Sequence, residues 1–365
     1  MASRPASPAR EAGFSLVELL VAMGITVSLM GSVLVLVSDL HLGFGAESER
    51  ADGQQRLRVA VEALSRDLAQ AGAGAQQGLH AGPLRSSTAS LFPFRQGAAG
   101  ADPPGTVRTD TLTVVYALAQ NAAQTTLGQP LAARSGAAVI NLDPGCPTND
   151  PACGFAPGMD VMVFDDTGSY DTFRVLTAQP GALQLQHNMA DTPQSYAAGA
   201  RIVEAASHTY FLRTDPGTDT FQLMHYDGVA SDAAVVDHVV GLTFEYFADP
   251  APPVLLRPVN DPTGPWTTYG PKPPSIAVQA TAYPAGENCA FQIDGATGQP
   301  VPRLPMLGDG LGDGLGDGSA TLVRLTDSQL RDGPWCPDAT NPHRYDADLL
   351  RVRRVAVTIR IEAAL

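Results

Sequence analysis

The chain begins with a short polar stretch and continues into a long apolar run. Leu19 to Ser38 contains no charged residue, and about 20 such residues are what a helix needs to cross roughly 30 Å of hydrocarbon. The pattern predicts a transmembrane helix over 14–45, preceded by a polar segment, 1–13. Because Arg4 and Arg10 lie in that polar segment and basic residues stay on the cytoplasmic side, we expect a single pass, with the C-terminal remainder outside the cytoplasm.

A helical period continues beyond the apolar run. Apolar residues recur at steps of three or four positions, which places them on one side of a helix: Leu57, Val61, Leu64, Leu68 and Ala71. Residues off this stripe are polar: Arg58, Glu62, Ser65 and Asp67. Gly72 and Gly74 supply a stop. The pattern predicts an amphipathic continuation of the helix over 46–72, with its apolar stripe covered by a sheet.

Short runs of β-branched and aromatic residues, separated by turn residues, dominate the rest of the chain. Strands are predicted at Thr111–Leu118, Met159–Phe164, Thr172–Thr177, Ala182–Gln186, Arg201–Arg213 and Thr220–His225. Apolar and polar residues alternate at 242–246 and at 355–361, which is typical of strands with one face on a core. We predict an α+β fold, in which the long N-terminal helix packs on a mainly antiparallel sheet domain formed by 73–249 and 319–365.

A Pro/Gly-rich segment, 250–318, interrupts the strand pattern as an insertion. Thirteen of the 30 prolines lie between Pro250 and Pro305, too many for a regular helix or a central strand. The segment ends in LGDGLGDGLGDG, where aspartates recur every four residues: Asp309, Asp313 and Asp317. Calcium binds carboxylates and is one interpretation, but the spacing does not fit an EF-hand loop. A flexible loop is favoured, and no metal is assigned.

Four cysteines all lie beyond the apolar run, which suits a chain exported to an oxidising compartment: Cys146, Cys153, Cys289 and Cys336. The first two flank the short turn-rich stretch CPTNDPAC and are expected to pair, which leaves the last two as a second disulfide. A zinc site is the alternative, but no C-x-x-C or nearby histidine pair favours it.

Charge and motifs argue against two large classes of function. The net charge is −14, from 37 acidic and 23 basic residues, which disfavours a general nucleic-acid surface. The sequence has no catalytic motif in a suitable context, and its seven histidines are scattered. His225 and His238 are interpreted as structural histidines, and Asp165, Asp166 and Asp171 as turn residues. We therefore expect no enzymatic activity and no cofactor.

Glu18 does not fit a plain membrane anchor, because a carboxylate inside a bilayer costs on the order of a few kcal/mol. The stretch GFSLVELLVAMGI, Gly13 to Ile25, resembles the class III signal of type IV pilin-like proteins: a glycine that ends the leader, then Phe, a Glu as the fifth mature residue, and an apolar helix. The resemblance implies that a prepilin peptidase cuts between Gly13 and Phe14 and that Phe14 is N-methylated. An ordinary signal peptide and a plain anchor are the alternatives.

The resemblance also implies a role for Glu18 in assembly. Among parallel helices, its carboxylate would pair with the Phe14 amine of a neighbouring subunit, so that a costly charge is satisfied. ALSRDLAQAGAG, Ala63 to Gly74, is similar to the end of the long helix in PilW-type minor pilins. The stretches at 235–247 and 348–363 resemble the closing strands of PilW-type pilins and of J-type pseudopilins.

The family implies a PilW-like minor pilin that takes part in assembly or priming of a type IV pilus. Its implied partners are a prepilin peptidase, other pilins or minor pilins and the inner-membrane assembly platform, with no nucleic acid. The chain would lie in the bacterial inner membrane and enter a pilus or pseudopilus. Two alternatives stay open: a J-type minor pseudopilin of a type II secretion system, and a membrane-anchored adhesin or binding protein that uses the insertion for recognition.

Overall fold

The computed structural model describes residues 15–73, 89–103, 105–116, 123–133, 135–142, 146–147, 150–164, 170–189, 194–248, 291–302, 322–332, 349 and 352–362, with 38–48, 291–293, 300 and 302 described by backbone alone. Residues 1–14 and most of the predicted insertion lie outside this set. The chain divides into an N-terminal unit, Met1–Gln55 with Ala363–Leu365, and a C-terminal unit, Arg56–Glu362. Each unit is described by itself below.

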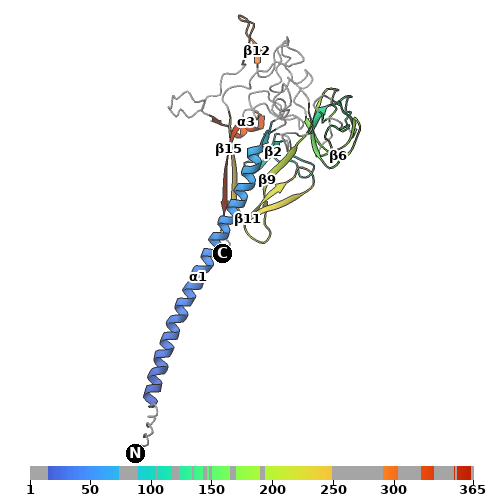
Figure 1. The fold of residues 1–365 in the computed structure, drawn as a ribbon. Coiled ribbons are helices and arrows are strands. Elements are labelled where there is room, and N and C mark those ends of the chain that lie inside the picture. Colours follow the sequence, from blue (N-terminus) through green and yellow to red (C-terminus); the bar gives the residue numbers. More distant parts are fainter. Residues whose placement is uncertain are drawn as a thin grey trace, which may run out of the picture. The chain divides into compact units, whose positions relative to one another are not determined.

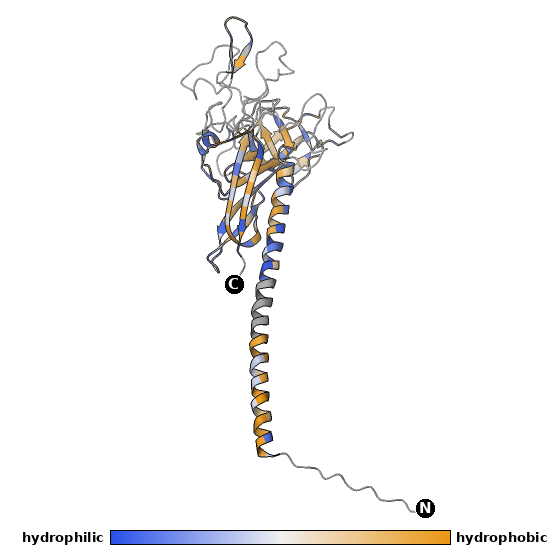
Figure 2. Ribbon diagram, turned by 90° about the vertical axis from the view of Figure 1, so that its left-hand side faces the viewer, coloured by the Kyte–Doolittle hydropathy of each residue, from blue (hydrophilic) through white to orange (hydrophobic). Residues whose placement is uncertain are grey.

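A single long helix, α1, runs over Leu16–Gln70 (Figure 1). The N-terminal part of α1 is strongly hydrophobic (Figure 2), and its last turns belong to the C-terminal unit. The helix ends at Gln70, close to Gly72 and Gly74, where the sequence pattern predicted its end. Gly72 has a φ of +67°, a left-handed conformation that glycine adopts without a steric cost, and its N–H donates to the Val115 carbonyl over 3.0 Å.

The larger sheet lies in the C-terminal unit and is antiparallel throughout. Its strand order is β1-β2-β9-β10-β11-β14, and β15 also pairs with β11. The strands are β1 Leu91–Phe92, β2 Leu112–Tyr116, β9 Ala206–Thr214, β10 Phe221–Tyr226, β11 Asp232–Ala248, β14 Val323–Arg324 and β15 Val352–Ile361. The 17-residue β11 pairs with β10 along its first half and with β15 along its second. The α+β class predicted from the sequence is confirmed.

The predicted apolar stripe of α1 is correct near the end of the helix, where Leu64, Leu68 and Ala71 pack in or against the core, and wrong before it. Ala60 and Leu64 are fully buried on the sheet, but Leu57 is 39% exposed and Val61 47% exposed. Asp67, which the pattern placed off the apolar stripe, is 2% exposed. Tyrosine and histidine side chains on the sheet face hydrogen-bond Asp67. These contacts turn a polar position inward.

A second antiparallel sheet, also in the C-terminal unit, has the order β3-β8-β5-β6-β7-β4. Its strands are β3 Gln124–Thr126, β4 Ala137–Val139, β5 Asp160–Phe164, β6 Tyr170–Gln179, β7 Ala182–His187 and β8 Arg201–Glu204. It has its own core, which includes Leu127, Val161, Phe173, Val175, Leu185 and Ile202. The sequence predicted several of these strands but gave no sign that they form a separate sheet.

The run Arg201–Arg213, predicted as one strand, is divided between the two sheets. Residues up to Glu204 form β8 of the second sheet, and residues from Ala206 form β9 of the first. Ala205 stands between them and its N–H donates to the Asp160 carbonyl of β5. The small, buried side chain of Ala205 suits a position where the chain passes from one packed layer to another.

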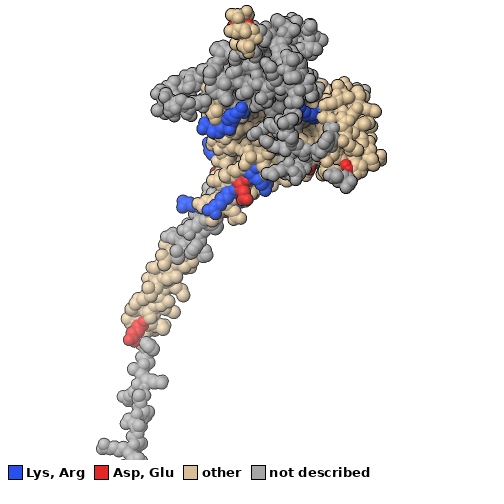
Figure 3. All heavy atoms as spheres, turned by 45° about the horizontal axis from the view of Figure 1, so that its top comes forward, with Lys and Arg blue, Asp and Glu red and all other residues tan. Residues whose placement is uncertain are grey.

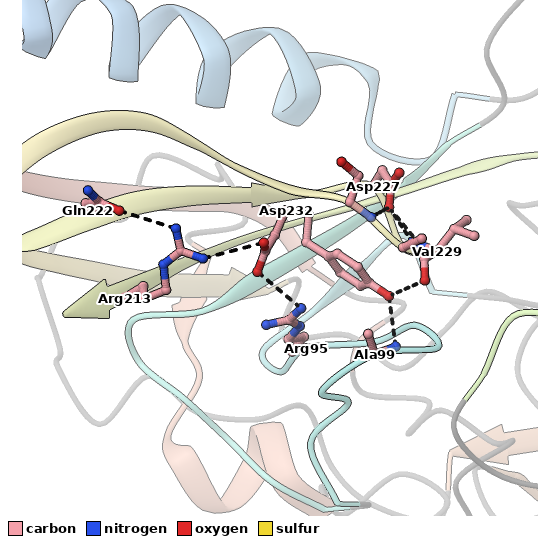
Figure 4. A network of polar contacts seen from close by, with 10 residues as sticks. Arg95, Ala99, Arg213, Gln222, Asp227, Val229 and Asp232 are labelled. Atoms are coloured by element: carbon pink, nitrogen blue, oxygen red, sulfur yellow. Dashed lines mark hydrogen bonds and ion pairs between the residues drawn. The ribbon is translucent and has the colours of Figure 1, made fainter. Parts of the chain in front are cut away.

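Polar contacts hold the turn between β10 and β11 against the segment after β1 (Figure 4). The Tyr226 hydroxyl accepts a hydrogen bond from Ala99 N–H over 3.0 Å and donates to the Val229 carbonyl over 3.1 Å. The Arg95 guanidinium lies 4.3 Å from the centre of the Tyr226 ring, a cation–π distance, and 3.9 Å from the Asp232 carboxylate. The buried tyrosine therefore has both of its polar partners supplied by loop backbone.

The remaining described elements are short. Residues 291–302, inside the predicted insertion, form a hairpin of β12 (Phe291–Ile293) and β13 (Pro300–Pro302). Helix α3, Asp327–Asp332, begins after Thr326, whose hydroxyl accepts a hydrogen bond from Gln329 N–H while the Gln329 side chain accepts one from Thr326 N–H. This reciprocal pair is a capping box.

Candidate functional sites

The first described turn of α1 is organised around Glu18. The Ser15 hydroxyl accepts a hydrogen bond from Glu18 N–H over 3.2 Å, and Glu18 Oε2 accepts one from Ser15 N–H over 3.0 Å. This S-x-x-E pair is a capping box, which satisfies two of the helix's free N–H groups and sets a negative charge against the positive end of the helix dipole. The Glu18 carboxylate is therefore folded back toward the N-terminal end of α1.

The segment Leu16–Val37 that follows is long and apolar enough to cross a membrane, and none of it is buried within the chain. Leu16 is 77% exposed and Leu34 69%. The described surface of this part is free of basic residues (Figure 3). Its hydroxyl groups bond to helix carbonyls four residues earlier: Thr26 to Ala22, Ser28 to Gly24 and Ser32 to Ser28. Polar groups satisfied within the helix suit an apolar surrounding, and the segment fits membrane anchoring.

A second site lies where the last turns of α1 meet the larger sheet. We call it the Asp67 cluster, and it consists of Asp67, Tyr116, His208, Tyr210 and His225. Asp67 comes from α1, Tyr116 from β2, His208 and Tyr210 from β9, and His225 from β10. His208 and Tyr210 are two residues apart on one strand and so face the same side, and Tyr210 is directly paired with His225. The sheet therefore presents four aromatic polar side chains to one carboxylate.

The Asp67 carboxylate lies within hydrogen-bonding distance of several side chains. Tyr210 donates to Oδ2 over 2.7 Å, and His208 Nδ1 lies 3.0 Å from the same oxygen. Tyr116 is 3.4 Å from Oδ1 and 3.2 Å from His208 Nδ1. His225 Nε2 lies 3.8 Å from Oδ2, longer than a hydrogen bond. Since buried carboxylates are stable only when their oxygens are satisfied, the sheet face makes an inward-pointing Asp67 possible.

The pKa values in the cluster follow from burial and these contacts. Burial alone would raise the pKa of Asp67, but hydrogen bonds from His208 and Tyr210 outweigh it, and the pKa is lowered. Desolvation, with Asp67 adding to it, raises the pKa of Tyr116 to about 12 and raises that of Tyr210 as well. Desolvation lowers the pKa of His225. The buried Asp67 carboxyl group is therefore ionised at neutral pH.

Sequence reasoning missed this cluster, although a signal was present. The apolar period of α1 predicted the buried face only in part, and Asp67 follows buried Leu64 by three residues. His208 and Tyr210 alternate along a predicted strand, which puts both on one face. His225 was interpreted as a structural histidine, and the structure places it beside Asp67.

The other residues singled out from the sequence are placed as follows. Cys146 and Cys153 are joined by a disulfide with their Cα atoms 4.6 Å apart, the pair expected from the sequence. The turn assignment of Asp171 was wrong, because Asp171 is fully buried in β6 and bonds to His187 and Tyr196. Outside the described residues lie Gly13, Phe14, Asp165, Asp166, Cys289, Cys336, Asp309, Asp313 and Asp317.

Comparison with known proteins gives one match. A family model for the prokaryotic N-terminal methylation motif matches residues 8–34, which include Glu18, its capping partner Ser15 and most of the apolar segment. No curated protein and no solved structure matches the chain. The matched motif supports a type IV pilin-like class III signal, which implies processing by a prepilin peptidase and association with other pilins, in a pilin-like or pseudopilin protein.

Proposed function

We propose that this chain is a PilW-like minor pilin that helps to prime or assemble a type IV pilus and carries out no catalysis. The observation that carries the proposal is that the methylation motif at 8–34 overlaps most of an apolar helical segment, Leu16–Val37, none of which is buried within the chain. Such a helix needs lipid or other helices around it. The membrane would supply lipid before assembly, and the parallel helices of a filament would take its place afterwards.

The geometry at Glu18 supports a role in assembly. Cleavage after Gly13 would place a positive amine on Phe14, next to Ser15, at the end of the helix toward which the Glu18 carboxylate is folded. A carboxylate alone in an apolar phase is costly, and pairing with an amine removes most of that cost. A neighbouring subunit would supply that amine only at one axial stagger, so the pair also favours a register.

The proposed partners follow from the same features. A prepilin peptidase would process the chain at the cytoplasmic face of the inner membrane, and the assembly platform and sibling minor pilins would then receive it. The C-terminal unit, which carries the two sheets, would lie outside the cytoplasm and contact the sibling subunits. The disulfide Cys146–Cys153 is consistent with an oxidising compartment.

Deletion of the gene in the native host tests the proposal. We expect surface filaments, counted by electron microscopy after shearing, to be lost or strongly reduced while protein secretion continues, and the full-length gene to restore them. Loss of secretion with filaments intact would instead identify a J-type pseudopilin. A second strain lacking only 250–318 tests the adhesin alternative: filaments that form normally but no longer attach to surfaces would favour adhesion over priming.

A further inference from the structure

The Asp67 cluster brings together a set of atoms that can bind a metal ion, and one of them, His225 Nε2, lies too far from Asp67 to hydrogen-bond it. Asp67, His208 and His225 each offer one ligand atom, and these atoms lie within 4.8 Å of one another. Oδ2 of Asp67 is 3.0 Å from His208 Nδ1 and 3.8 Å from His225 Nε2. Ligands of a tetrahedral ion at about 2.0–2.1 Å are roughly 3.3 Å apart, and the two observed separations lie on either side of that value.

We propose that Asp67, His208 and His225 bind one divalent transition-metal ion of the zinc type, with water completing the coordination. Two imidazoles and a carboxylate suit Zn²⁺, whereas calcium and magnesium prefer all-oxygen sites. The inference is independent of the proposed function, because it concerns only the C-terminal unit.

The surroundings of the three ligands match those of a metal site. Ligating carboxylates are normally held by further hydrogen bonds, and Tyr210 and Tyr116 donate to the two oxygens of Asp67. The exposed Arg66 side chain lies 3.7 Å from Oδ1 of Asp67. Its positive charge is therefore beside the carboxylate oxygen that is not the one nearest the two histidines. Metal binding would replace the direct contact between His208 and Asp67 and would use the nitrogen of His225, which is too far from Oδ2 for a hydrogen bond.

The exposure of the three side chains also indicates how an ion would reach the site and what its binding would do to stability. The side chains of His208 and His225 are 23% and 29% exposed, whereas that of Asp67 is 3% exposed. An ion and its water can therefore reach the imidazoles from solvent while the carboxylate stays anchored below. Because the ligands come from α1, β9 and β10, a bound ion would join the end of the helix to the sheet, and binding to the folded state alone would stabilise that state.

The test uses the full-length chain in detergent, carrying a tag without histidines, after chelator treatment and desalting. We expect isothermal titration with Zn²⁺ to show one site per chain and the melting temperature to rise with Zn²⁺ concentration. His225→Gln should weaken binding at least tenfold. His187→Gln is the matched control, because His187 pairs with the buried Asp171 over 2.9 Å at a separate site, and it should bind as the wild type does. Equal binding by the wild type and His225→Gln would overturn the proposal.

The wild-type chain alone gives an independent test that does not depend on how well a variant folds. Co²⁺ in place of Zn²⁺ should give the intense visible absorption of a four-coordinate ion with nitrogen ligands, and added Zn²⁺ should abolish it. A spectrum identical to that of hydrated Co²⁺ would show that the three side chains do not form a metal site.

Discussion

Glu18→Gln is expected to remain in the membrane and to be excluded from filaments. Glutamine keeps an oxygen that can accept the Ser15 N–H and so preserves the helix cap, but it removes the charge that would pair with a neighbour's Phe14 amine. Removing one member of a desolvated ion pair costs about 3–5 kcal/mol. Since about 1.4 kcal/mol corresponds to a tenfold change in an equilibrium constant, incorporation should fall at least tenfold.

The measurement is quantitative immunoblotting of sheared filaments and of washed membranes from the same cells. Glu62→Gln is the matched control, because it removes the same charge from an exposed position of α1 beyond the apolar segment, and it should enter filaments normally. Glu18→Val, which loses both the cap and the charge, should behave like Glu18→Gln if charge pairing is what matters. Wild-type incorporation of Glu18→Gln would mean that Glu18 serves only as a helix cap.

Asp67→Asn is expected to lower the free energy of unfolding of the C-terminal unit by about 2–4 kcal/mol. The amide is nearly the same size as the carboxylate, so no cavity forms. It carries no charge, however, and its NH2 group places donors where one carboxylate oxygen accepted a hydrogen bond from Tyr210 or Tyr116. Each buried polar group left without a partner costs about 1–3 kcal/mol. Tyr210 keeps the Ala63 carbonyl, 3.2 Å from its hydroxyl, as an alternative acceptor, which favours the lower end of the range.

Urea unfolding of the full-length chain in detergent, with chelator present throughout, measures this effect without any contribution from bound metal. Near-ultraviolet circular dichroism reports on packing around the fully buried tyrosines, namely Tyr170, Tyr196, Tyr210, Tyr226 and Tyr246. Glu62→Gln again serves as the control and should change stability by less than about 0.5 kcal/mol, as surface substitutions usually do. An unchanged midpoint for Asp67→Asn would show that the cluster contributes nothing to the attachment of α1.

The parts of the fold that the sequence predicted are those set by local pattern. The apolar run and the glycines after Ala71 delimit α1, and alternation of apolar and polar residues marks β11 and β15. The buried face of the helix was predicted correctly only in part, because it depends on which sheet residues meet it. The burial of Asp67 illustrates this: its partners His208 and Tyr210 lie more than 140 positions away in the chain.

Strand pairing was the other part that local pattern did not give. Arg201–Arg213 is an unbroken run without glycine or proline, and nothing in it marks Ala205 as the point where the chain changes sheets. The order of the second sheet depends on contacts between residues far apart in sequence, such as Met162 with Val203. At the N-terminus, in contrast, local pattern was enough to single out Glu18, because it is one charged residue in an otherwise apolar stretch.

The most direct test of the account is the N-terminus of the mature protein. Intact-mass and N-terminal peptide analysis of the chain purified from its native membrane should give a protein that begins at Phe14 and carries one N-methyl group. That result would establish processing as a prepilin. A chain that begins at Met1 would be a plain anchor, and one that begins near Ala46 an ordinary secreted protein; either result would contradict the role proposed for Glu18.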